Sequence, residues 1–285
     1  MTAHERHDLP TASRVVVKVG SSSISGENAA KIQPLVEALA EAHGRGTEIV
    51  LVSSGAIATG MPFLALDERP SDLATQQAAA AVGQNVLIYR YQASLRPFRI
   101  VAGQVLLTAG DLENPTHRSN ARRAMERLLG LRILPIVNEN DTVATHEIRF
   151  GDNDRLAALV AQLIAADALI LLSDIECLYT RPPDEPGAKP IPLVVYGDDL
   201  DGYQFGSVVV NSVGTGGAAT KVSAARLAAA SGIGVLVTSA DLIDRALAGD
   251  DIGTWFAPNP EPAAAGATGP VRTVGAAAAA DTLGG

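Results

Sequence analysis

Short apolar runs alternate with helical stretches along most of this 285-residue chain, and each run breaks off into small or polar residues. The runs are Arg14 to Val19, Ile49 to Val52, Ile100 to Leu107, Ile133 to Val137, Ala168 to Leu172 and Gly234 to Thr238. Strands separated by helices in this way favour a mostly parallel central sheet sandwiched by helices. We therefore predict an α/β fold whose ligands bind at the carboxyl edge of the sheet.

The most polar of these strand ends follows Ile133 to Val137, where the four residues Asn138 to Asp141 are all carboxamides or carboxylates. A second polar cluster, Asp152 to Asp154, is placed to cap a helix predicted from Arg155 to Ala166. Carboxylates at this density repel one another unless they bind a cation, an amine or backbone donors. The stretch is therefore a candidate substrate site, although a solvated loop followed by a helix cap fits the same residues.

Two earlier strand ends carry small residues. Lys18 and the run Gly20 to Ser23 close the first strand, and Ser53 to Ala56 close the second. Backbone N–H groups in such loops can approach a phosphate closely, and a lysine adds fixed positive charge. Either loop alone is a weak indication, but two in succession favour a bound phosphate.

A third small-residue segment, Gly214 to Lys221, follows a predicted strand (Val208 to Val213) and precedes a helix that ends near Ser231. Its first six residues match the dinucleotide fingerprint G-x-G-x-x-A, which is typical of a nicotinamide-dependent oxidoreductase. That fingerprint belongs to the first strand-helix unit of its fold, whereas this segment comes late in the chain. The P-loop pattern is absent because Thr220, and not glycine, precedes Lys221. A nucleotide held by other means remains open.

The composition disfavours several classes of protein. A net charge of -9 argues against nucleic-acid binding. The single cysteine, Cys177, excludes an intramolecular disulfide and suits the cytoplasm. The charged N-terminus has no apolar core of signal-peptide length, and no later apolar run reaches the length of a membrane span. The five histidines are not spaced like metal ligands, so we expect any metal to be magnesium that enters with nucleotide phosphates.

Local signals predict several further segments. Ser71 is expected to cap a long helix that runs towards Leu95. Asp111 to His117 is predicted to be a polar loop, before an amphipathic helix that ends at Leu129 and whose arginines face solvent. The proline-rich stretch Tyr179 to Pro192 is predicted to be a surface loop.

Taken together, the motifs resemble those of the amino acid kinase family, from about Val15 to Phe256. The most specific pieces are VKVGSS from Val17, SSGAIATG from Ser53, AAVGQ from Ala80, SNAR from Ser119, NENDTVAT from Asn138, GDND from Gly151, LYT from Leu178 and GTGGAATK from Gly214. Within this family, the motifs resemble the members that phosphorylate the γ-carboxylate of L-glutamate with ATP, at the start of proline biosynthesis. A relative acting on another small carboxylate or a phosphonate is the nearest alternative.

The resemblance also implies an organisation. Residues 14–258 would form the kinase domain, with the acid bound towards the N-terminal half and ATP towards the C-terminal half. Residues 1–13 would be an N-terminal extension. Longer members carry a C-terminal PUA domain, whereas residues 259–285 here read as a disordered tail of small residues. A cytoplasmic homo-oligomer is expected, with the downstream glutamyl phosphate reductase as a possible partner.

The resemblance implies a role for each site residue. Lys18 and Lys221 would neutralise the phosphoryl group in flight, and Asp154 would orient both lysines. The glutamate would be held by Ser54, Asp141 and Asn153, with Asp141 paired to the substrate ammonium. The nucleotide, with magnesium, would be held by Lys18, Ser173, Asp174, Thr215, Gly216, Gly217, Ala218, Ala219, Thr220 and Lys221. Because the substrate carboxylate is itself the nucleophile, no base is required.

The chain departs from the family pattern at two places on the nucleotide side. Cys177 stands where many members have glycine before Leu-Tyr-Thr, and Ala218 with Ala219 replaces a common Met-Ser pair. We expect these departures to affect nucleotide affinity rather than the chemistry of transfer.

Overall fold

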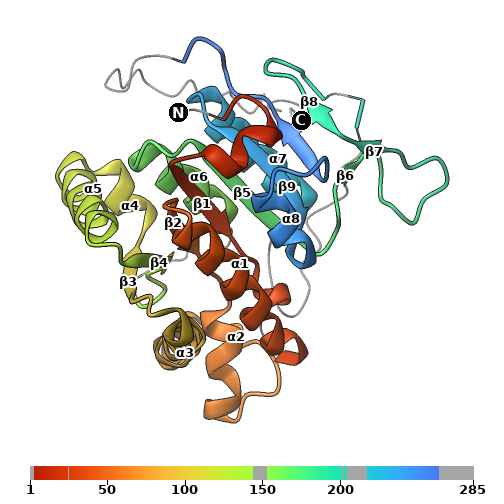
Figure 1. The fold of residues 1–285 in the computed structure, drawn as a ribbon. Coiled ribbons are helices and arrows are strands. Elements are labelled where there is room, and N and C mark those ends of the chain that lie inside the picture. Colours follow the sequence, from red (N-terminus) through yellow and green to blue (C-terminus); the bar gives the residue numbers. More distant parts are fainter. Residues whose placement is uncertain (1–2, 25, 144–152, 201, 204–216, 263–285) are drawn as a thin grey trace, which may run out of the picture.

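The computed structural model describes residues 3–24, 26–143, 153–200, 202–203 and 217–262. An eight-stranded sheet forms its centre, in the order β3-β4-β2-β1-β5-β9-β10-β8 (Figure 1). The strands of this sheet are β1 (Arg14–Lys18), β2 (Glu48–Val52), β3 (Ala102–Leu107), β4 (Leu134–Glu139), β5 (Ala168–Ser173), β8 (Leu193–Val194), β9 (Gly234–Ser239) and β10 (Thr254–Phe256). The six strands from β3 to β9 pair in parallel, so the predicted mostly parallel sheet is confirmed.

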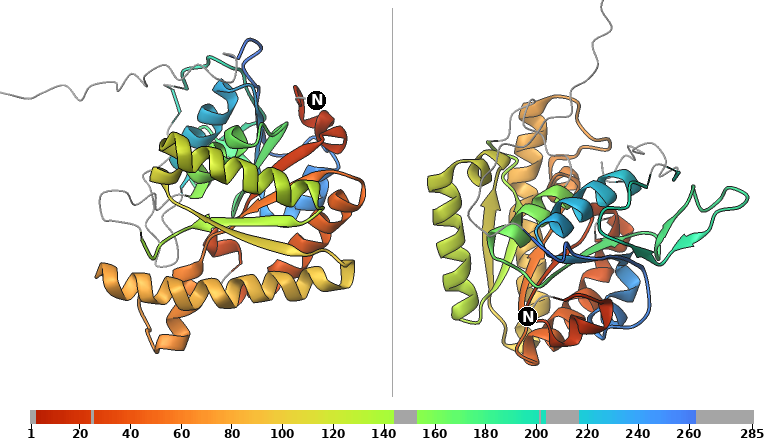
Figure 2. Two further views of the ribbon diagram at one scale, coloured as in Figure 1. Left: turned by 90° about the vertical axis from the view of Figure 1, so that its left-hand side faces the viewer. Right: turned by 90° about the horizontal axis from the view of Figure 1, so that it is seen from above.

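Helices cover both faces of this sheet. The α-helices are α1 (Ile32–Gly44), α2 (Ala56–Gly60), α3 (Leu73–Leu95), α4 (Ala109–Glu113), α5 (Pro115–Gly130), α6 (Asn153–Leu163), α7 (Ala218–Ala230) and α8 (Ile243–Leu247). Short 3-10 helices are η1 (Arg6–Thr11), η2 (Ser21–Ser23), η3 (Gly26–Lys31), η4 (Met61–Leu64), η5 (Arg96–Phe98) and η6 (Ala240–Leu242). In the left view of Figure 2, α3 and α5 lie on opposite sides of β3 and β4.

The central strand β1 shows why the strands read as continuous apolar runs. Successive side chains of a strand point to opposite faces, so Val15 and Val17 enter one core and Val16 enters the other. The first core also receives α1, α3 and α8, and the second receives α5, α6 and α7. A strand buried on both faces needs apolar side chains throughout, and its first polar residue therefore marks the carboxyl edge.

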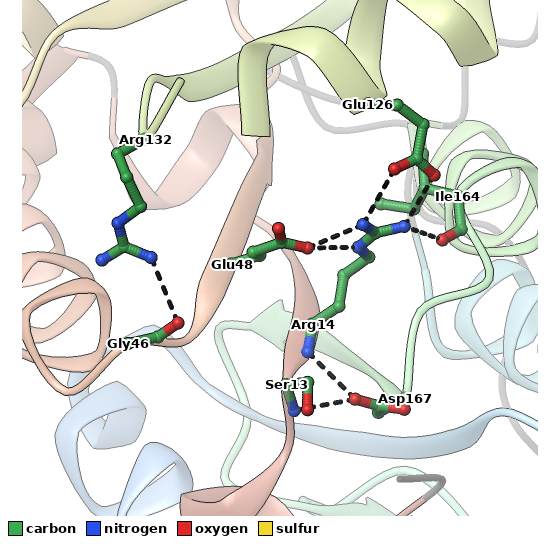
Figure 3. Close-up of polar contacts among 8 residues, drawn as sticks. All are labelled: Ser13, Arg14, Gly46, Glu48, Glu126, Arg132, Ile164 and Asp167. Atoms are coloured by element: carbon green, nitrogen blue, oxygen red, sulfur yellow. Dashed lines mark hydrogen bonds and ion pairs between the residues drawn. The ribbon is translucent and has the colours of Figure 1, made fainter. Parts of the chain in front are cut away.

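A network of charged side chains fixes the opposite end of β1 (Figure 3). Arg14 donates to Glu48 at 2.7 Å and to Glu126 at 2.9 and 3.0 Å, and it also donates to the carbonyl of Ile164. Burial alone would lower the pKa of Arg14, but its hydrogen bonds to Glu126 and Glu48 outweigh this and raise the pKa above its usual value. The carboxylate of Asp167 accepts from the backbone N–H of Arg14 at 3.0 Å. These contacts tie β1 to β2, α5 and α6.

The segment before β1 packs against the far end of the sheet. Arg6 is buried and donates to the carbonyls of Ile252 at 2.7 Å and Pro192 at 2.6 Å. The indole of Trp255 donates to the carbonyl of His4 at 3.1 Å. Residues of this segment thus satisfy backbone groups around β8 and β10.

The predicted polar loop from Asp111 to His117 is wrong, because these residues belong to α4 and to the first turn of α5. Thr108 and Asp111 form a capping box in which each side chain accepts from the other residue's backbone N–H. Asn114 caps α5 by accepting from the N–H groups of Thr116 and His117. The polar residues cap helices here, which composition alone cannot distinguish from a loop.

Other local predictions are close to the structure. Helix α3 begins at Leu73, with Asp72 and not Ser71 as its cap. The arginines of α5 at 122, 123 and 127 are exposed, as expected. The ends of the predicted surface loop pair as β6 (Leu178–Tyr179) and β7 (Pro190–Ile191). The predicted strand 208–213 and the tail from 263 onward lie outside the described residues.

Helices α2 and α3 pack so closely that two glycines lie against the facing backbone. A Cβ added at Gly83 would lie 1.8 Å from the carbonyl oxygen of Ala56, and one added at Gly60 would lie 1.9 Å from that of Ala79. Real atoms cannot approach so closely, so any side chain at either position forces the helices apart. The small residues in two of the sequence motifs therefore serve packing beside the second strand end.

We expect Gly83→Ala to reduce the free energy of unfolding by about 3 kcal/mol, because the new methyl group meets backbone and not a movable side chain. Urea unfolding of the purified variant measures this. The matched control is Gly130→Ala, where an added Cβ meets nothing within 4 Å. This control should be neutral or slightly stabilising, because alanine is the better helix former. Equal stability of the two variants would contradict the close packing of α2 on α3.

Candidate active site

Three charged side chains from separate elements meet at the carboxyl edge of the sheet. Lys18 ends β1, Asp154 lies in the first turn of α6, and Lys221 lies in the first turn of α7. Lys18 Nζ lies 2.5 Å from Asp154 Oδ1, and Lys221 Nζ lies 3.2 Å from Asp154 Oδ2. Asp154 has no exposed surface, and Lys18 and Lys221 are 4% and 6% exposed. The structure thus brings together the three residues predicted to be catalytic.

The charge of this trio favours an anion. The three groups together carry one more positive than negative charge, and each is held in place by burial and by its partner. Ion pairs removed from water interact more strongly than exposed pairs, and lysines already oriented lose little further freedom when an anion arrives. The arrangement is therefore suited to stabilise negative charge that develops at this edge of the sheet.

Thr220 connects Asp154 to the start of α7. Its hydroxyl lies 3.0 Å from Asp154 Oδ2 and 2.8 Å from the carbonyl oxygen of Gly217, and it accepts from the N–H of Gly217 at 3.1 Å. The side chain of Thr220 thus contacts Asp154, a contact that the predicted nucleotide role does not include. Ala218 and Ala219 form the first turn of the same helix, whereas Thr215 and Gly216 lie outside the described residues.

Ser54 and Asn153, two of the predicted acid-binding residues, are in direct contact. The Asn153 amide donates to Ser54 Oγ at 2.9 Å, and Asn153 directly precedes Asp154. Ser54 lies at the end of β2, where Gly55 has a φ of 88° that favours glycine. Gly55 is the N-cap of α2, which begins at Ala56. The third residue, Asp141, is half-buried in the turn that follows β4, at the same edge.

Two buried residues beside this pair received no role from the sequence. Tyr91 Oη lies 3.0 Å from Ser53 Oγ, and burial raises the pKa of Tyr91 so far that its hydroxyl stays protonated. This contact fixes the serine turn to α3. Asn138 is buried at the end of β4, and among the described residues its amide nitrogen has no hydrogen-bond partner. A buried free donor at this edge is able to bind an acceptor oxygen.

Ser173 and Asp174 lie on the other side of β1. Ser173 is the last residue of β5 and Asp174 follows it, and the Ser173 hydroxyl donates to Asp174 Oδ1 at 3.1 Å. Because β1 lies between β2 and β5, Lys18 separates two groups of polar residues along the sheet edge. The predicted acid side lies towards β2 and β4, and the predicted nucleotide side lies towards β5, β9 and α7.

Within 3–24, 26–143, 153–200, 202–203 and 217–262, no three His, Cys, Asp or Glu side chains are grouped so that they could hold a metal ion. In the same part of the chain, no helix has the length and hydropathy needed to cross a membrane.

Comparisons with known proteins agree with the motifs. The model of the amino acid kinase family matches residues 13–239. A glutamate 5-kinase of Leifsonia xyli subsp. xyli is 70% identical over 263 residues, which cover 92% of this chain and 97% of that protein. One from Salinispora arenicola is 52% identical over 264 residues, covering 91% and 72%. The resemblance inferred from the motifs is thus confirmed.

Solved structures show the same fold at low sequence identity. Carbamate kinase from Giardia lamblia bound to AMP-PNP superposes with a TM-score of 0.65 at 15% identity, over 88% of this chain and 100% of that one. UMP kinase from Bacillus anthracis gives 0.57 at 14% identity, over 86% and 96%.

Proposed function

The chain belongs to the amino acid kinase family, and from this premise we propose that it transfers the γ-phosphoryl group of ATP to the γ-carboxylate of L-glutamate. The reaction is the first step of proline biosynthesis and forms γ-glutamyl phosphate and ADP. The observation that carries the mechanism is the buried trio of Lys18, Asp154 and Lys221, which lies between the two polar groups of the sheet edge. The choice of glutamate is supported by the relatives' names.

In the proposed reaction, a carboxylate oxygen of glutamate attacks the γ-phosphorus, the bond to the bridging oxygen of ADP breaks, and the bridging oxygen keeps the electron pair. Glutamate is already ionised near pH 7, so no proton has to be removed. Catalysis then consists of positioning and charge stabilisation. Lys18 and Lys221 stabilise the charge on the transferring group and the leaving phosphate, and Asp154 holds both ammonium groups in place.

The acid is proposed to lie towards β2 and β4. Ser54 and Asn153 would hold the reacting end, and the amide of Asn138, which has no partner among the described residues, would donate to a substrate oxygen. Asp141 would pair with the α-ammonium group. A relative acting on another small carboxylate or a phosphonate would use the same lysines, so the acid-side residues are what distinguish the two proposals.

The nucleotide is proposed to lie towards β5 and α7. Ser173, Asp174 and the segment Thr215 to Lys221 would hold it, with phosphates at the amino end of α7, where N–H groups favour anions. Magnesium would supply further charge neutralisation. We assign it to the ATP phosphates because the carboxylate of Asp154 already contacts both lysines.

The wider setting is also part of the proposal. The product is an acyl phosphate, which reacts readily with amines and water, so a reductase that consumes it is the expected partner. We propose a cytoplasmic location, in line with the single cysteine. We also propose a homo-oligomer, which the resemblance to the family implies.

The purified protein with ATP, magnesium and L-glutamate should form an acyl phosphate that hydroxylamine traps as γ-glutamyl hydroxamate, measured by the colour of its iron complex. D-Glutamate, L-aspartate, acetate and a small phosphonate form the comparison panel. ATP consumption with each compound is followed in parallel, since a phosphonyl phosphate would not yield a hydroxamate. Turnover with another compound of the panel and none with L-glutamate would overturn the substrate assignment and favour the second candidate.

A further inference from the structure

A cavity lies at the amino edge of the sheet, opposite the candidate active site. It has a volume of about 490 Å³, within the usual range for sites that bind small molecules. Its walls come from the carboxyl end of α1, from the connection between α3 and β3, and from the connection between α5 and β4. None of the residues assigned to catalysis or substrate binding lines it.

Part of the wall of this cavity is apolar and open to solvent. Phe98, Val101 and Leu131 line it with 42%, 55% and 51% of their surfaces exposed. A single exposed apolar side chain is ordinary, but three large ones from two separate connections at one cavity form a surface that favours an apolar ligand.

Two arginines line the same cavity, each in a backbone conformation that favours glycine. Arg99 has a φ of 58° and Arg132 a φ of 59°. Each arginine follows the end of a helix. The backbone N–H of the residue after the arginine donates back across the turn to a helix carbonyl, from Ile100 to Leu95 and from Ile133 to Leu128. Glycine occupies the equivalent position at the ends of α1 and α7. The backbone therefore gives no reason for arginine at these two positions.

Contacts account for one of the two arginines. Arg132 donates to the carbonyl of Gly46 at 3.1 Å (Figure 3) and to that of His43, so it caps the carboxyl end of α1. His43 also lines the cavity, and burial and the neighbouring Arg132 lower its pKa, which favours the neutral ring. Within the described part of the chain, the Arg99 side chain makes no hydrogen bond or ion pair, and only its backbone N–H bonds, to the carbonyl of Arg96. Arg99 thus lines this cavity in a left-handed backbone conformation, and its charged group has no partner among the described residues.

We propose that this cavity binds a small organic anion with an apolar body. The anionic group, a carboxylate, sulfonate or phosphate, faces Arg99, and the apolar body lies against Phe98, Val101 and Leu131. The chain as a whole carries a net charge of -9, whereas two arginines make the charge at this cavity positive. The proposal is independent of the reaction proposed for the opposite edge.

The test uses 8-anilinonaphthalene-1-sulfonate, which has an apolar body and one sulfonate and fluoresces when it leaves water. Binding to the full-length protein is titrated with and without excess ATP and magnesium, which are proposed to bind at the opposite edge. Arg99→Gly should weaken binding by about two- to fivefold, as expected for the loss of an exposed charge contact. Because glycine accepts the backbone conformation of residue 99, this variant should melt at or above the wild-type temperature.

Three further variants separate the charge of Arg99 from general electrostatic attraction, from relief of backbone strain and from the apolar contact. Arg122→Ala removes an exposed arginine of α5 that does not line the cavity, and Ala65→Gly relieves another left-handed position without a change of charge. Both should bind the probe like the wild type, whereas Phe98→Ala should weaken binding. Unchanged affinity in Arg99→Gly, an equal loss in Arg122→Ala, or displacement of the probe by ATP would each overturn the proposal.

Discussion

Lys221→Ala is expected to lower kcat by a hundredfold or more, roughly the effect of removing one preorganised donor from developing charge. Lys221 Nζ contacts Asp154 in a buried site, so its charge acts where water screens little. If Lys221 acts mainly in the transition state, kcat should fall more than the KM values rise. Folding should change little, because Lys18 and Thr220 still contact Asp154.

A surface lysine provides the control for this variant. Lys31 forms an ion pair with Asp241 at 3.0 Å. Both side chains of this pair are exposed, whereas those of the trio are buried. Lys31→Ala should keep kcat within about twofold, since exposed pairs contribute little. Steady-state kinetics of both variants, with circular dichroism to show that they are folded, decide the question. Near-normal turnover by folded Lys221→Ala would mean that this lysine only packs on α7.

The carboxylate between the lysines should matter even more. Asp154→Asn removes the charge that both buried ammonium groups contact, and breaking a buried ion pair in this way costs about 3 to 5 kcal/mol. We also expect turnover to fall by about three orders of magnitude, because both lysines lose the group that orients them. Thermal unfolding and kinetics measure the two effects separately.

Asp241→Asn is the matched control, since it removes the same charge from the exposed pair with Lys31. Its stability should stay within about 1 kcal/mol of the wild type. The turnover of Asp154→Asn is then compared with that of Asp241→Asn at a temperature well below both melting transitions, where both variants are folded. A folded Asp154→Asn variant with wild-type stability and turnover would contradict the assigned role.

The layered fold was predictable because its signal is local. A strand such as Val15 to Lys18 is buried on both faces, so its sequence is continuously apolar up to the carboxyl edge. The order of the strands was not predictable, since no local pattern tells which strands pair. The short strand β10 was missed for the same reason. Its Thr254 is buried through contacts with Leu178 and Ile191, which come from distant parts of the chain.

The site was predictable to the extent that residues at strand ends converge. Lys18 ends one parallel strand and Ser54 follows another, so their meeting with the start of α6 needs only the rule that strand ends share an edge. Contacts within the site depend on distances that sequence does not contain. The Thr220 contact with Asp154, the Tyr91 contact with Ser53 and the free amide of Asn138 were found only in the structure.

The central claim is that the γ-carboxylate of glutamate attacks the γ-phosphorus of ATP at the lysine trio. L-Glutamate labelled with oxygen-18 in both γ-carboxylate oxygens tests this directly, in a reaction with ATP, magnesium and hydroxylamine. Hydroxylamine attacks the acyl carbon, so the released phosphate keeps the bridging oxygen that came from glutamate. We predict one oxygen-18 atom in each phosphate released, by mass spectrometry, and loss of this product in Lys221→Ala. Phosphate without label would show that water attacks ATP, which contradicts the account.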